Sequence, residues 1–426
     1  MVLKKIKIFK IGYVGLTHLG LTYLTSSLIK NQEVVGYDLD QNKINNFKNC
    51  EYDITERNLI SKLKYYKNKI FYTDQIKKLN KCDLIFVSCD VKTNNKNESD
   101  YTKLNNYLRL IKQNINFTIP IIILSQVKPG FTRNLKLNKF KLYYQVETLI
   151  FGRALQQAIK PKRIIVGKKN KKDKLDSKYL IYLKKFQSPI LEMIYESAEL
   201  CKIAINIMLA SSLTAANTIA NISEKIGADF SEITPALKLD PRIGKNSYIN
   251  PGLGISGGNI ERDIVTVQKL IKENNIKENN LMNSIYTISQ KRKNWTFDIF
   301  QEIYKRHKIF KIAIFGFTYK KNNSSYKNSP TINLLKNLKK LNLNIQVYDD
   351  LVSIKKINLN CNFNPNIKEV VKNSDILIFM RDFKDKKKLE RINYLGLMKK
   401  NFIIDPFGIF KNIFETNKKF VYKKIG

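Results

Sequence analysis

The sequence predicts an α/β protein with two doubly wound parallel sheets joined by a central helical domain that contains a long helix. Two observations carry this prediction. Near both ends of the chain, apolar runs of strand length alternate with helix-length stretches, as in parallel sheets covered by helices. From Pro189 onward the pattern changes to long helical periodicity. We therefore expect three domains, over residues 1–190, 191–305 and 306–426.

Composition places the chain among globular proteins. It has 426 residues, 43% of them hydrophobic and 11% aromatic, which is enough for a large core and several domains. Apolar runs such as 119–124 are strand-sized and fall short of the ~20 residues of a membrane span. The five cysteines show no CxxC spacing, so we expect neither a disulfide framework nor a metal site. A cytoplasmic protein without a membrane partner is expected.

The net charge of +40 comes from 76 basic and 36 acidic residues. Nucleic-acid binding is one interpretation, because neutralising phosphates requires clustered Lys and Arg. Here the lysines are spread along the chain among many Asn and Ile, which indicates a compositional bias instead of a binding stripe. We expect no nucleic-acid partner. The positive field still favours small anions, nucleotides included.

The first 40 residues contain a strand, a glycine turn, a helix and a second strand. An apolar run over 5–14 precedes the turn 15–20, and the strand 33–37 ends at Asp38. This order is that of the dinucleotide-binding unit, in which the helix N-terminus meets the pyrophosphate and the acid binds the adenosine ribose. His18 is either a hydrogen-bond donor to phosphate or a helix-start residue without chemistry.

Two registers of the glycine motif compete. One runs through Gly12, but it puts Lys10 at the first glycine position and leaves Asp38 too far downstream. Starting the motif at Gly15 places the acid near the expected distance of about 20 residues. In that register Thr17 occupies the second glycine position and Gly20 the third. We adopt it, which makes the fingerprint degenerate.

Later strands of this domain end in polar residues. Buried-strand runs over 83–88 and 120–125 lead to Asp90 and Gln126, and Glu147 follows further along. Open α/β sheets bind ligands at the carboxyl ends of their strands, so these side chains are candidates for a site. The alternative is that they are loop residues without a ligand. A further strand is expected at 163–167.

The helical segment and the glycine stretch after it hold the next candidates. Lys202 and Asn206 lie four residues apart on an apolar helix over 198–223, so they share a face and need partners. The alternative is a lysine that reaches solvent along the helix. Residues 251–263 read PGLGISGGNIERD, where dense glycines let the backbone approach a ligand, unless the stretch is a flexible surface loop.

A second α/β unit follows a helical stretch over 279–305. Its predicted strands lie at 309–317, 344–348, 376–379 and 402–404, with a helix over 331–341 between the first two. Two of these strands end directly in acidic residues, as the second strand of the first unit does.

The order of these motifs resembles the UDP-glucose/GDP-mannose dehydrogenase family over nearly the whole chain. The segments that carry the resemblance are GLTHLG with VVGYDLD, SQVKPGFTR at 125–133, ETLIFGRAL at 147–155, ELCKIAIN at 199–206, DPRIGKNSYINPGLGISGGNIERD at 240–263 and FGFTYKKNNSSYKNSP at 315–330. The family oxidises the C6 hydroxyl of a nucleotide sugar to a carboxylate in two NAD-dependent hydride transfers, through a cysteine adduct. The resemblance implies two Rossmann-like domains, a homodimer and a role in polysaccharide biosynthesis.

The resemblance also implies a role for particular residues. Asp38 and Lys43 would hold the adenosine ribose of NAD. Other cofactor contacts would be Gly15, Thr17, Gly20, Gln126, Arg262 and Lys327. The catalytic positions would be Glu147, Lys202, Asn206, Asp263 and Asn259. The nucleotide sugar would contact Tyr248, Gly252, Gly257 and Lys320.

The chain departs from the family at the nucleophile. Asn259 stands where the family has its cysteine, and an amide cannot form a thiohemiacetal. Gln126 replaces a threonine and Phe151 a second glutamate. We therefore expect an NAD-dependent oxidoreductase that acts on the CH–OH group of a UDP- or GDP-sugar and stops after one oxidation. The alternatives are an NAD-retaining nucleotide-sugar epimerase and a catalytically inactive nucleotide-sugar-binding homologue.

Overall fold

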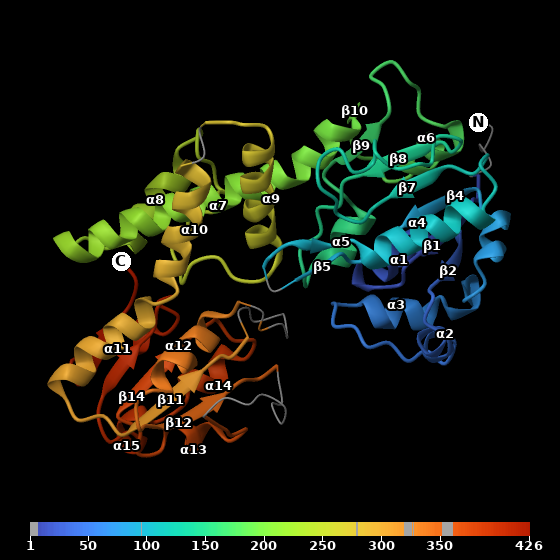
Figure 1. The fold of residues 1–426 in the computed structure, drawn as a ribbon. Coiled ribbons are helices and arrows are strands. Elements are labelled where there is room, and N and C mark those ends of the chain that lie inside the picture. Colours follow the sequence, from blue (N-terminus) through green and yellow to red (C-terminus); the bar gives the residue numbers. More distant parts are fainter. Residues whose placement is uncertain (1–6, 95, 278–279, 319–325, 327, 352–360) are drawn as a thin grey trace, which may run out of the picture. The chain divides into compact units, whose positions relative to one another are not determined.

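The structure is a computed structural model, and it describes residues 7–94, 96–277, 280–318, 326, 328–351 and 361–426 (Figure 1). The chain divides into two compact units, Met1–Ile205 and Asn206–Gly426. Each unit contains its own mostly or wholly parallel sheet and its own hydrophobic clusters. The predicted α/β fold class with two doubly wound sheets and a long central helix is confirmed.

The first unit is built on an eight-stranded sheet with the order β10-β9-β8-β7-β4-β1-β2-β3. Neighbouring strands are parallel except β8 and β9, which are antiparallel. The strands are β1 Lys10–Val14, β2 Glu33–Tyr37, β3 Ile70–Thr73, β4 Leu84–Val87, β7 Ile121–Ile123, β8 Leu142–Gln145, β9 Ile164–Lys168 and β10 Ile190–Ile194. The direction of winding reverses between β1 and β4, and ligands of doubly wound sheets bind at such a point.

The described part of β1 is shorter than the predicted run 5–14. The strand begins at Lys10, and Ile8 before it is exposed. The helices of this unit are α1 His18–Ile29, α2 Gln41–Lys48, α3 Leu59–Tyr65, α4 Thr102–Asn114, α5 Ala154–Ile159 and α6 Ser177–Lys184. Two 3₁₀ turns, Lys67–Lys69 and Ile76–Lys81, and the hairpin of β5 Lys92–Thr93 with β6 Ser99–Asp100 complete it.

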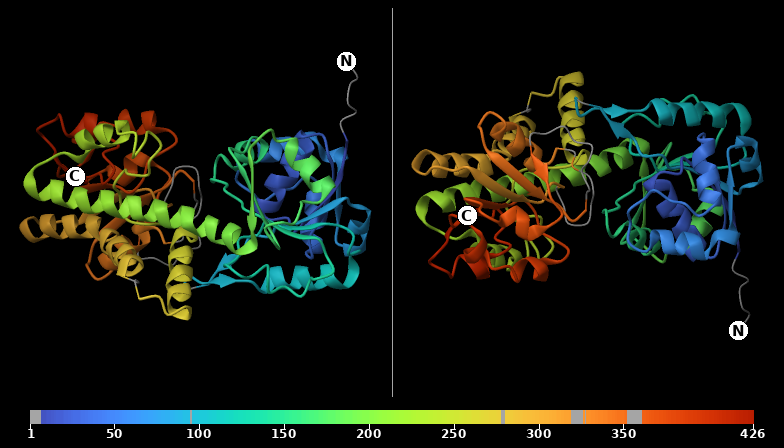
Figure 2. Two further views of the ribbon diagram at one scale, coloured as in Figure 1. Left: turned by 90° about the horizontal axis from the view of Figure 1, so that it is seen from above. Right: turned by 90° about the horizontal axis from the view of Figure 1, so that it is seen from below.

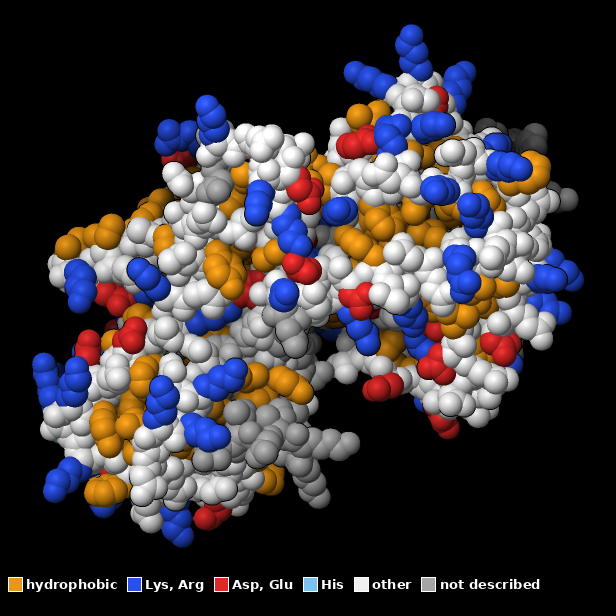
Figure 3. All heavy atoms as spheres, in the orientation of Figure 1, with side chains coloured by type: hydrophobic (Ala, Val, Ile, Leu, Met, Phe, Trp, Pro, Cys, Tyr) orange, Lys and Arg blue, Asp and Glu red, His pale blue; other side chains and the backbone are white. Residues whose placement is uncertain are grey.

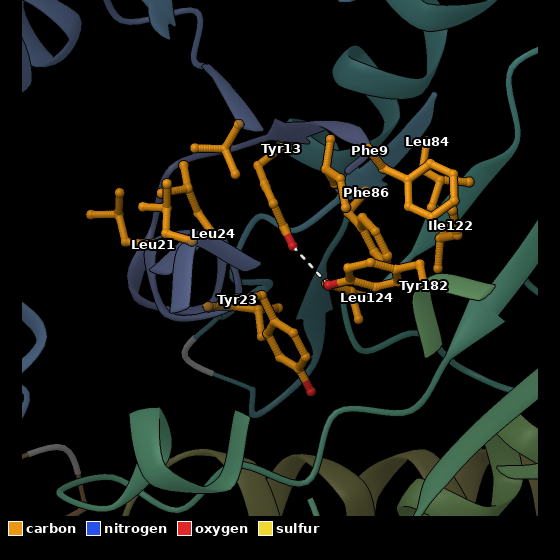
Figure 4. Close-up of a cluster of buried hydrophobic side chains, with 14 of the residues drawn as sticks. Phe9, Tyr13, Leu21, Tyr23, Leu24, Leu84, Phe86, Ile122, Leu124 and Tyr182 are labelled. Atoms are coloured by element: carbon orange, nitrogen blue, oxygen red, sulfur yellow. Dashed lines mark hydrogen bonds between the residues drawn. The ribbon is translucent and has the colours of Figure 1, made fainter. Parts of the chain in front are cut away.

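The side chains of each strand alternate between two buried clusters, one on each face of the sheet. One cluster contains a polar contact in its interior. The Tyr13 hydroxyl lies 2.7 Å from Ser27 Oγ. It also lies 3.4 Å from the Tyr182 hydroxyl (Figure 4). Buried hydroxyls need such partners, because an unpaired one costs free energy of folding. These contacts fix α1 and α6 on the same face of the sheet.

Helix α7, Tyr195–Ile226, is a single helix of 32 residues that begins in the first unit and continues in the second (Figure 2). Within the described chain it is the helix that is long and apolar enough to cross a membrane by length and composition alone. Core helices of soluble proteins pass the same test. Five buried polar side chains lie on α7: Glu199, Lys202, Asn206, Asn217 and Ser223. Each of them makes a hydrogen bond or an ion pair within the protein.

The second unit combines helices with a six-stranded parallel sheet of order β13-β12-β11-β14-β15-β16. Its strands are β11 Lys311–Phe315, β12 Asn344–Tyr348, β13 Asn362–Phe363, β14 Ile376–Phe379, β15 Phe402–Ile404 and β16 Val421–Lys423. Its helices are α8 Phe230–Leu239, α9 Asn259–Glu273, α10 Asn280–Arg292, α11 Trp295–Arg306, α12 Pro330–Leu338, α13 Ile367–Val371, α14 Lys386–Glu390, α15 Tyr394–Leu397 and α16 Lys411–Phe414. The helical stretch predicted over 279–305 therefore divides into α10 and α11.

Candidate active site

The glycine turn follows β1 as the adopted register requires. Gly15 has a φ of +89°, a backbone region that favours glycine, and its N–H donates to the Tyr37 carbonyl over 2.9 Å. Gly20 lies against this turn in α1, because a Cβ there would stand 2.1 Å from the Gly15 carbonyl oxygen. Both glycines are thus required for the close packing of α1 on the turn.

Thr17 fits the turn without strain. Its φ is −85°, so the second position of the motif needs no glycine for its backbone conformation. The hydroxyl donates to the Ser88 carbonyl at 3.3 Å and accepts from the Asp90 N–H at 2.9 Å. Thr17 is also the N-cap residue of α1, and it makes no side-chain capping bond there. The Leu19 amide in the first turn of α1 is bonded to the Asp90 carboxylate, and an anion at this helix N-terminus would meet the remaining amides of that turn.

Asp38 is fully buried and accepts several hydrogen bonds. Its carboxylate accepts from Leu16 N at 2.9 Å, from Lys43 Nζ at 3.0 Å and from the Tyr107 hydroxyl at 2.8 Å. Lys103 Nζ lies 3.6 Å away. Burial alone would raise the pKa of Asp38, but the two lysines outweigh it and hold the pKa below its usual value. The group is therefore an ionised acceptor beside the turn.

These residues fit a dinucleotide. A glycine turn packed on a helix whose N-terminal amides are not capped by the N-cap side chain suits a diphosphate, and an ionised acid after β2 suits a ribose diol. Asp38 and Lys43 are brought together as predicted. When bound, NAD supplies the acceptor for a hydride. Tyr107 and Lys103, four residues apart on α4, were not predicted.

The Glu147 carboxylate forms an ion pair with Lys202 over 2.8 Å. Lys202 is 9% exposed and does not extend to solvent, contrary to the alternative interpretation of a snorkelling lysine. The second carboxylate oxygen of Glu147 accepts from Leu149 N at 3.0 Å, which orients the group at the start of its loop. The ion pair ties the loop that carries Glu147 to α7.

The second unit contains a matching polar contact. Asn206 Nδ2 donates to Asp263 Oδ2 over 2.5 Å, and Arg262 Nε lies 3.4 Å from the other oxygen. Asp263 and Arg262 are both buried in the first turns of α9. An ionised carboxylate with an amide on one oxygen can accept a proton or orient a hydroxyl.

The glycine stretch is held by hydrogen bonds to its backbone. Gly252 N donates to Asn217 Oδ1 over 2.8 Å, and Arg292 Nε donates to the Gly252 carbonyl over 3.1 Å. Gly254 has a φ of +74°, and a Cβ there would stand 2.4 Å from the Ser289 carbonyl oxygen. Asn328 Nδ2 donates to the Gly257 carbonyl over 3.0 Å. The backbone is therefore anchored to three neighbouring elements, unlike a loose surface loop.

The remaining predicted residues lie as follows. Asn259 is the first residue of α9 and is exposed. Tyr248 is 44% exposed on the segment between α8 and α9. Gln126 is partly buried and follows β7 at the carboxyl end of the strand. Lys320 and Lys327 lie outside the described residues.

The sequence did not predict that two buried acids, Glu199 and Glu261, hold neighbouring groups of the site in place. Glu199 on α7 accepts from Gly130 N at 2.6 Å and from Thr132 N at 2.8 Å, and burial raises its pKa despite these bonds. Glu261 on α9 pairs with Lys293 over 2.6 Å. Glu199 could have been suspected as an acid on an apolar helix face. Nothing in the sequence indicated the partner of Glu261.

The sheet of the second unit repeats the backbone arrangement of the first. Gly316 N donates to the Tyr348 carbonyl over 2.9 Å, as Gly15 N does to Tyr37. Asp349 then accepts from Phe317 N at 2.6 Å, as Asp38 does from Leu16. Here, however, the buried Arg381 guanidinium lies 3.1 Å from the acid. The Asp349 carboxylate therefore has a charged partner inside the protein. Among the described residues, no cluster of three or more His, Cys, Asp and Glu side chains could hold a metal ion.

Three sequence models of one family match the chain in order. They are the NAD binding domain of the UDP-glucose/GDP-mannose dehydrogenase family over residues 4–187, its central domain over 196–291 and its UDP binding domain over 313–412. The chain belongs to this family. It is an NAD-dependent oxidoreductase of the nucleotide-sugar dehydrogenase type.

Individual relatives agree. A UDP-glucose 6-dehydrogenase of Campylobacter jejuni is 31% identical over 361 residues, 83% of this chain and 88% of that protein. UDP-glucose 6-dehydrogenase TuaD of Bacillus subtilis is 23% identical over 432 residues, 98% and 93% of the two chains. Among solved structures, a UDP-glucose dehydrogenase of Pyrobaculum islandicum has a TM-score of 0.84 at 18% identity, over 95% of each chain. A UDP-D-ManNAc dehydrogenase of Pyrococcus horikoshii has a TM-score of 0.83 at 20% identity, over 98% and 99%. These two support the fold.

Proposed function

We propose that this family member oxidises the CH–OH group of a UDP-sugar with NAD and stops after a single oxidation. The observation that carries the proposal is Asn259 at the first position of α9, four residues before the buried Asp263. Asp263 on α9 and its hydrogen-bond partner Asn206 on α7 are both present, while the residue at the start of α9 carries an amide in place of a thiol.

The proposed reaction balances without a covalent adduct. The carbinol carbon gives a hydride to NAD⁺ and the hydroxyl gives its proton to a base, which yields NADH, a carbonyl and a proton. We assign Asp263 as the base or the group that orients it, and Lys202 and Asn206 as donors to the reacting oxygen. A second oxidation requires an adduct or a hydrate of the aldehyde, and Asn259 cannot form the adduct.

The test is an assay of the purified protein with NAD and a panel of UDP- and GDP-sugars. We expect NADH from at least one sugar, at one NADH per sugar consumed, with an aldehyde or ketone product seen by NMR. No NADH from any sugar contradicts the proposal, and two NADH per sugar contradict the single oxidation. A changed sugar without net NADH would point to the epimerase. Thermal stabilisation by a nucleotide sugar without any turnover would point to the inactive homologue.

Asp38 supports NAD over NADP in this proposal. The carboxylate is ionised and would repel a 2′-phosphate, whereas it accepts hydrogen bonds from a free 2′-hydroxyl. The UDP binding domain supports UDP over GDP as the nucleotide. We further propose that the protein works in the cytoplasm, in polysaccharide biosynthesis, and that residues 1–190, 191–305 and 306–426 act as its three domains.

We also propose that the protein is a homodimer through α7. In the second unit this helix exposes an apolar stripe at helical spacing: Met208, Ala215, Ile219, Ile222 and Ile226. An apolar stripe at this spacing is typical of a helix packed on another protein surface. Light scattering on the wild type should give twice the chain mass, and Ile219→Glu with Ile222→Glu should give a monomer. A monomeric wild type would contradict this proposal.

A further inference from the structure

The carboxylate of Glu56 is buried among three segments of the first unit. Its side chain has no exposed surface. One oxygen accepts from Gly152 N at 2.8 Å and lies 3.1 Å from His18 Nε2, and the other accepts from Ala154 N at 3.1 Å. Glu56 itself lies between α2 and α3. Three donors from two distant segments thus converge on one carboxylate.

The two segments that Glu56 joins are those of the candidate site. His18 is the first residue of α1 and directly follows residues 15–17 of the glycine turn, which we call the cofactor turn. Gly152 ends the loop between β8 and α5, and Glu147 begins the same loop. The ring of His18 also packs on Phe151 with the centroids 4.6 Å apart. The cofactor turn and the loop that carries the Glu147 carboxylate are therefore connected through Glu56.

Glu147 at the start of the loop pairs with Lys202, but the other hydrogen bonds described for the residues after it are local. Ile150 N donates to Gln157 Oε1 over 2.6 Å, and Arg153 N donates to the Ile150 carbonyl over 2.9 Å. These bonds shape the loop, but they do not tie it to α1. Removing the Glu56 carboxylate would leave two loop amides without their acceptor, which costs free energy and lets the loop seek other conformations.

We propose that Glu56 is a positioning residue, which together with His18 sets the place of the Glu147 loop relative to the cofactor turn. This proposal rests on the proposed function, in which Lys202, the ion-pair partner of Glu147, acts on the reacting oxygen. Glu56 contacts neither the cofactor turn's glycines nor Lys202, and it acts through the loop. A displacement of about 1 Å at a reacting group can reduce turnover about 100-fold.

The experiment compares Glu56→Ala and Glu56→Gln with the wild type and with Glu51→Ala. Glu51 is an exposed glutamate in the same segment and is the matched control. The glutamine keeps one acceptor oxygen for the loop amides, so it is the conservative variant. Hydrogen exchange of residues 148–155, the affinity for NADH by fluorescence, the melting temperature, and kcat and KM for the sugar are measured for each.

For Glu56→Ala we expect exchange in 148–155 to rise about tenfold or more and kcat to fall about tenfold or more, with the KM for the sugar within about twofold. Glu56→Gln should show hydrogen exchange and kcat between those of Glu56→Ala and the wild type. Glu51→Ala should match the wild type. Unchanged exchange in 148–155, or a lower melting temperature with an unchanged kcat, would overturn the proposal. If no sugar yields NADH with the wild type, the proposed function fails. Exchange and NADH affinity then still decide whether Glu56 fixes the loop.

Discussion

At the residue scale, we propose that Asn259 decides how far the reaction proceeds. A cysteine at the first position of α9 would have a low pKa, because the amides and dipole of a helix N-terminus stabilise a thiolate. In Asn259→Cys we expect the yield to rise from one NADH per sugar toward two, since the aldehyde could then be trapped and oxidised. Alkylation by iodoacetamide at position 259, located by peptide mapping to separate it from the five native cysteines, confirms a reactive thiol. A reactive thiol with the yield still at one would show that another residue limits the reaction.

Asp263 is the residue on which proton transfer should depend. It is fully buried and bonded to Asn206, so Asp263→Asn keeps its volume but removes the charge that accepts a proton. We expect kcat/KM to fall about 100-fold or more, while the affinity for NADH, most of whose expected contacts lie in the first unit, changes little. Asp298→Asn on α11, where the acid is exposed, is the control and should keep full activity. An Asp263→Asn protein of normal activity would exclude the acid from the reaction.

At the element scale, an ion-pair cluster joins α8 to the end of the chain. Asp229 is the N-cap of α8, and its carboxylate lies 3.1 Å from Lys411 Nζ and 2.9 Å from Lys424 Nζ. Partial burial would raise the pKa of Asp229, but its hydrogen bonds to Ser231 and the two lysines outweigh it and lower the pKa. A carboxyl group whose pKa is lowered by folding stabilises the fold above its unfolded pKa of about 3.9, and this contribution is lost as the pH falls further.

In Asp229→Asn the helix cap is kept and the ion pairs are lost. We expect the free energy of unfolding of the second unit to fall by about 0.5–1 kcal/mol at pH 7, and the difference from the wild type to shrink as the pH falls below about 4. Urea denaturation at pH 7 and at pH 3 measures both values. An equal loss at the two pH values would show that the effect is not electrostatic.

The elements themselves were largely predictable, because strands and helices follow from local periodicity. The predicted strands 344–348, 376–379 and 402–404 coincide with β12, β14 and β15. Periodicity did not reveal the break at Lys293 between α10 and α11, where the buried lysine pairs with Glu261 instead of continuing a helix. By contrast, the four-residue spacing of Lys202 and Asn206 was enough to place them on one face of α7.

Contacts between distant segments were not predictable in the same way. Asp38 followed from the motif, but its contact with Tyr107 joins residues 69 positions apart, and no local pattern specifies such a pair. The same holds for the Glu56 carboxylate, whose loop partners are 96 and 98 positions away. The site residues that the family motif carries were therefore accessible from the sequence, whereas the residues that hold them in place were not.

At the scale of the whole molecule, charge does not identify a partner. Lys and Arg side chains are scattered over the face shown in Figure 3 among uncharged ones, and no stripe is seen there. This agrees with the interpretation of the net charge of +40 as compositional bias. The field that it produces acts on any small anion, and its effect should weaken with salt.

The two compact units should also unfold separately, since each has its own sheet and its own hydrophobic clusters. The single tryptophan, Trp295, lies buried in the second unit with its indole N–H 3.0 Å from Glu224 Oε2, so its fluorescence reports that unit alone. Circular dichroism reports both units. NADH at about 100 times its Kd should stabilise the first unit by about 2.7 kcal/mol. We expect it to delay the loss of circular dichroism while leaving the Trp295 transition in urea where it was. Coincident transitions that shift together with NADH would show that the units unfold as one.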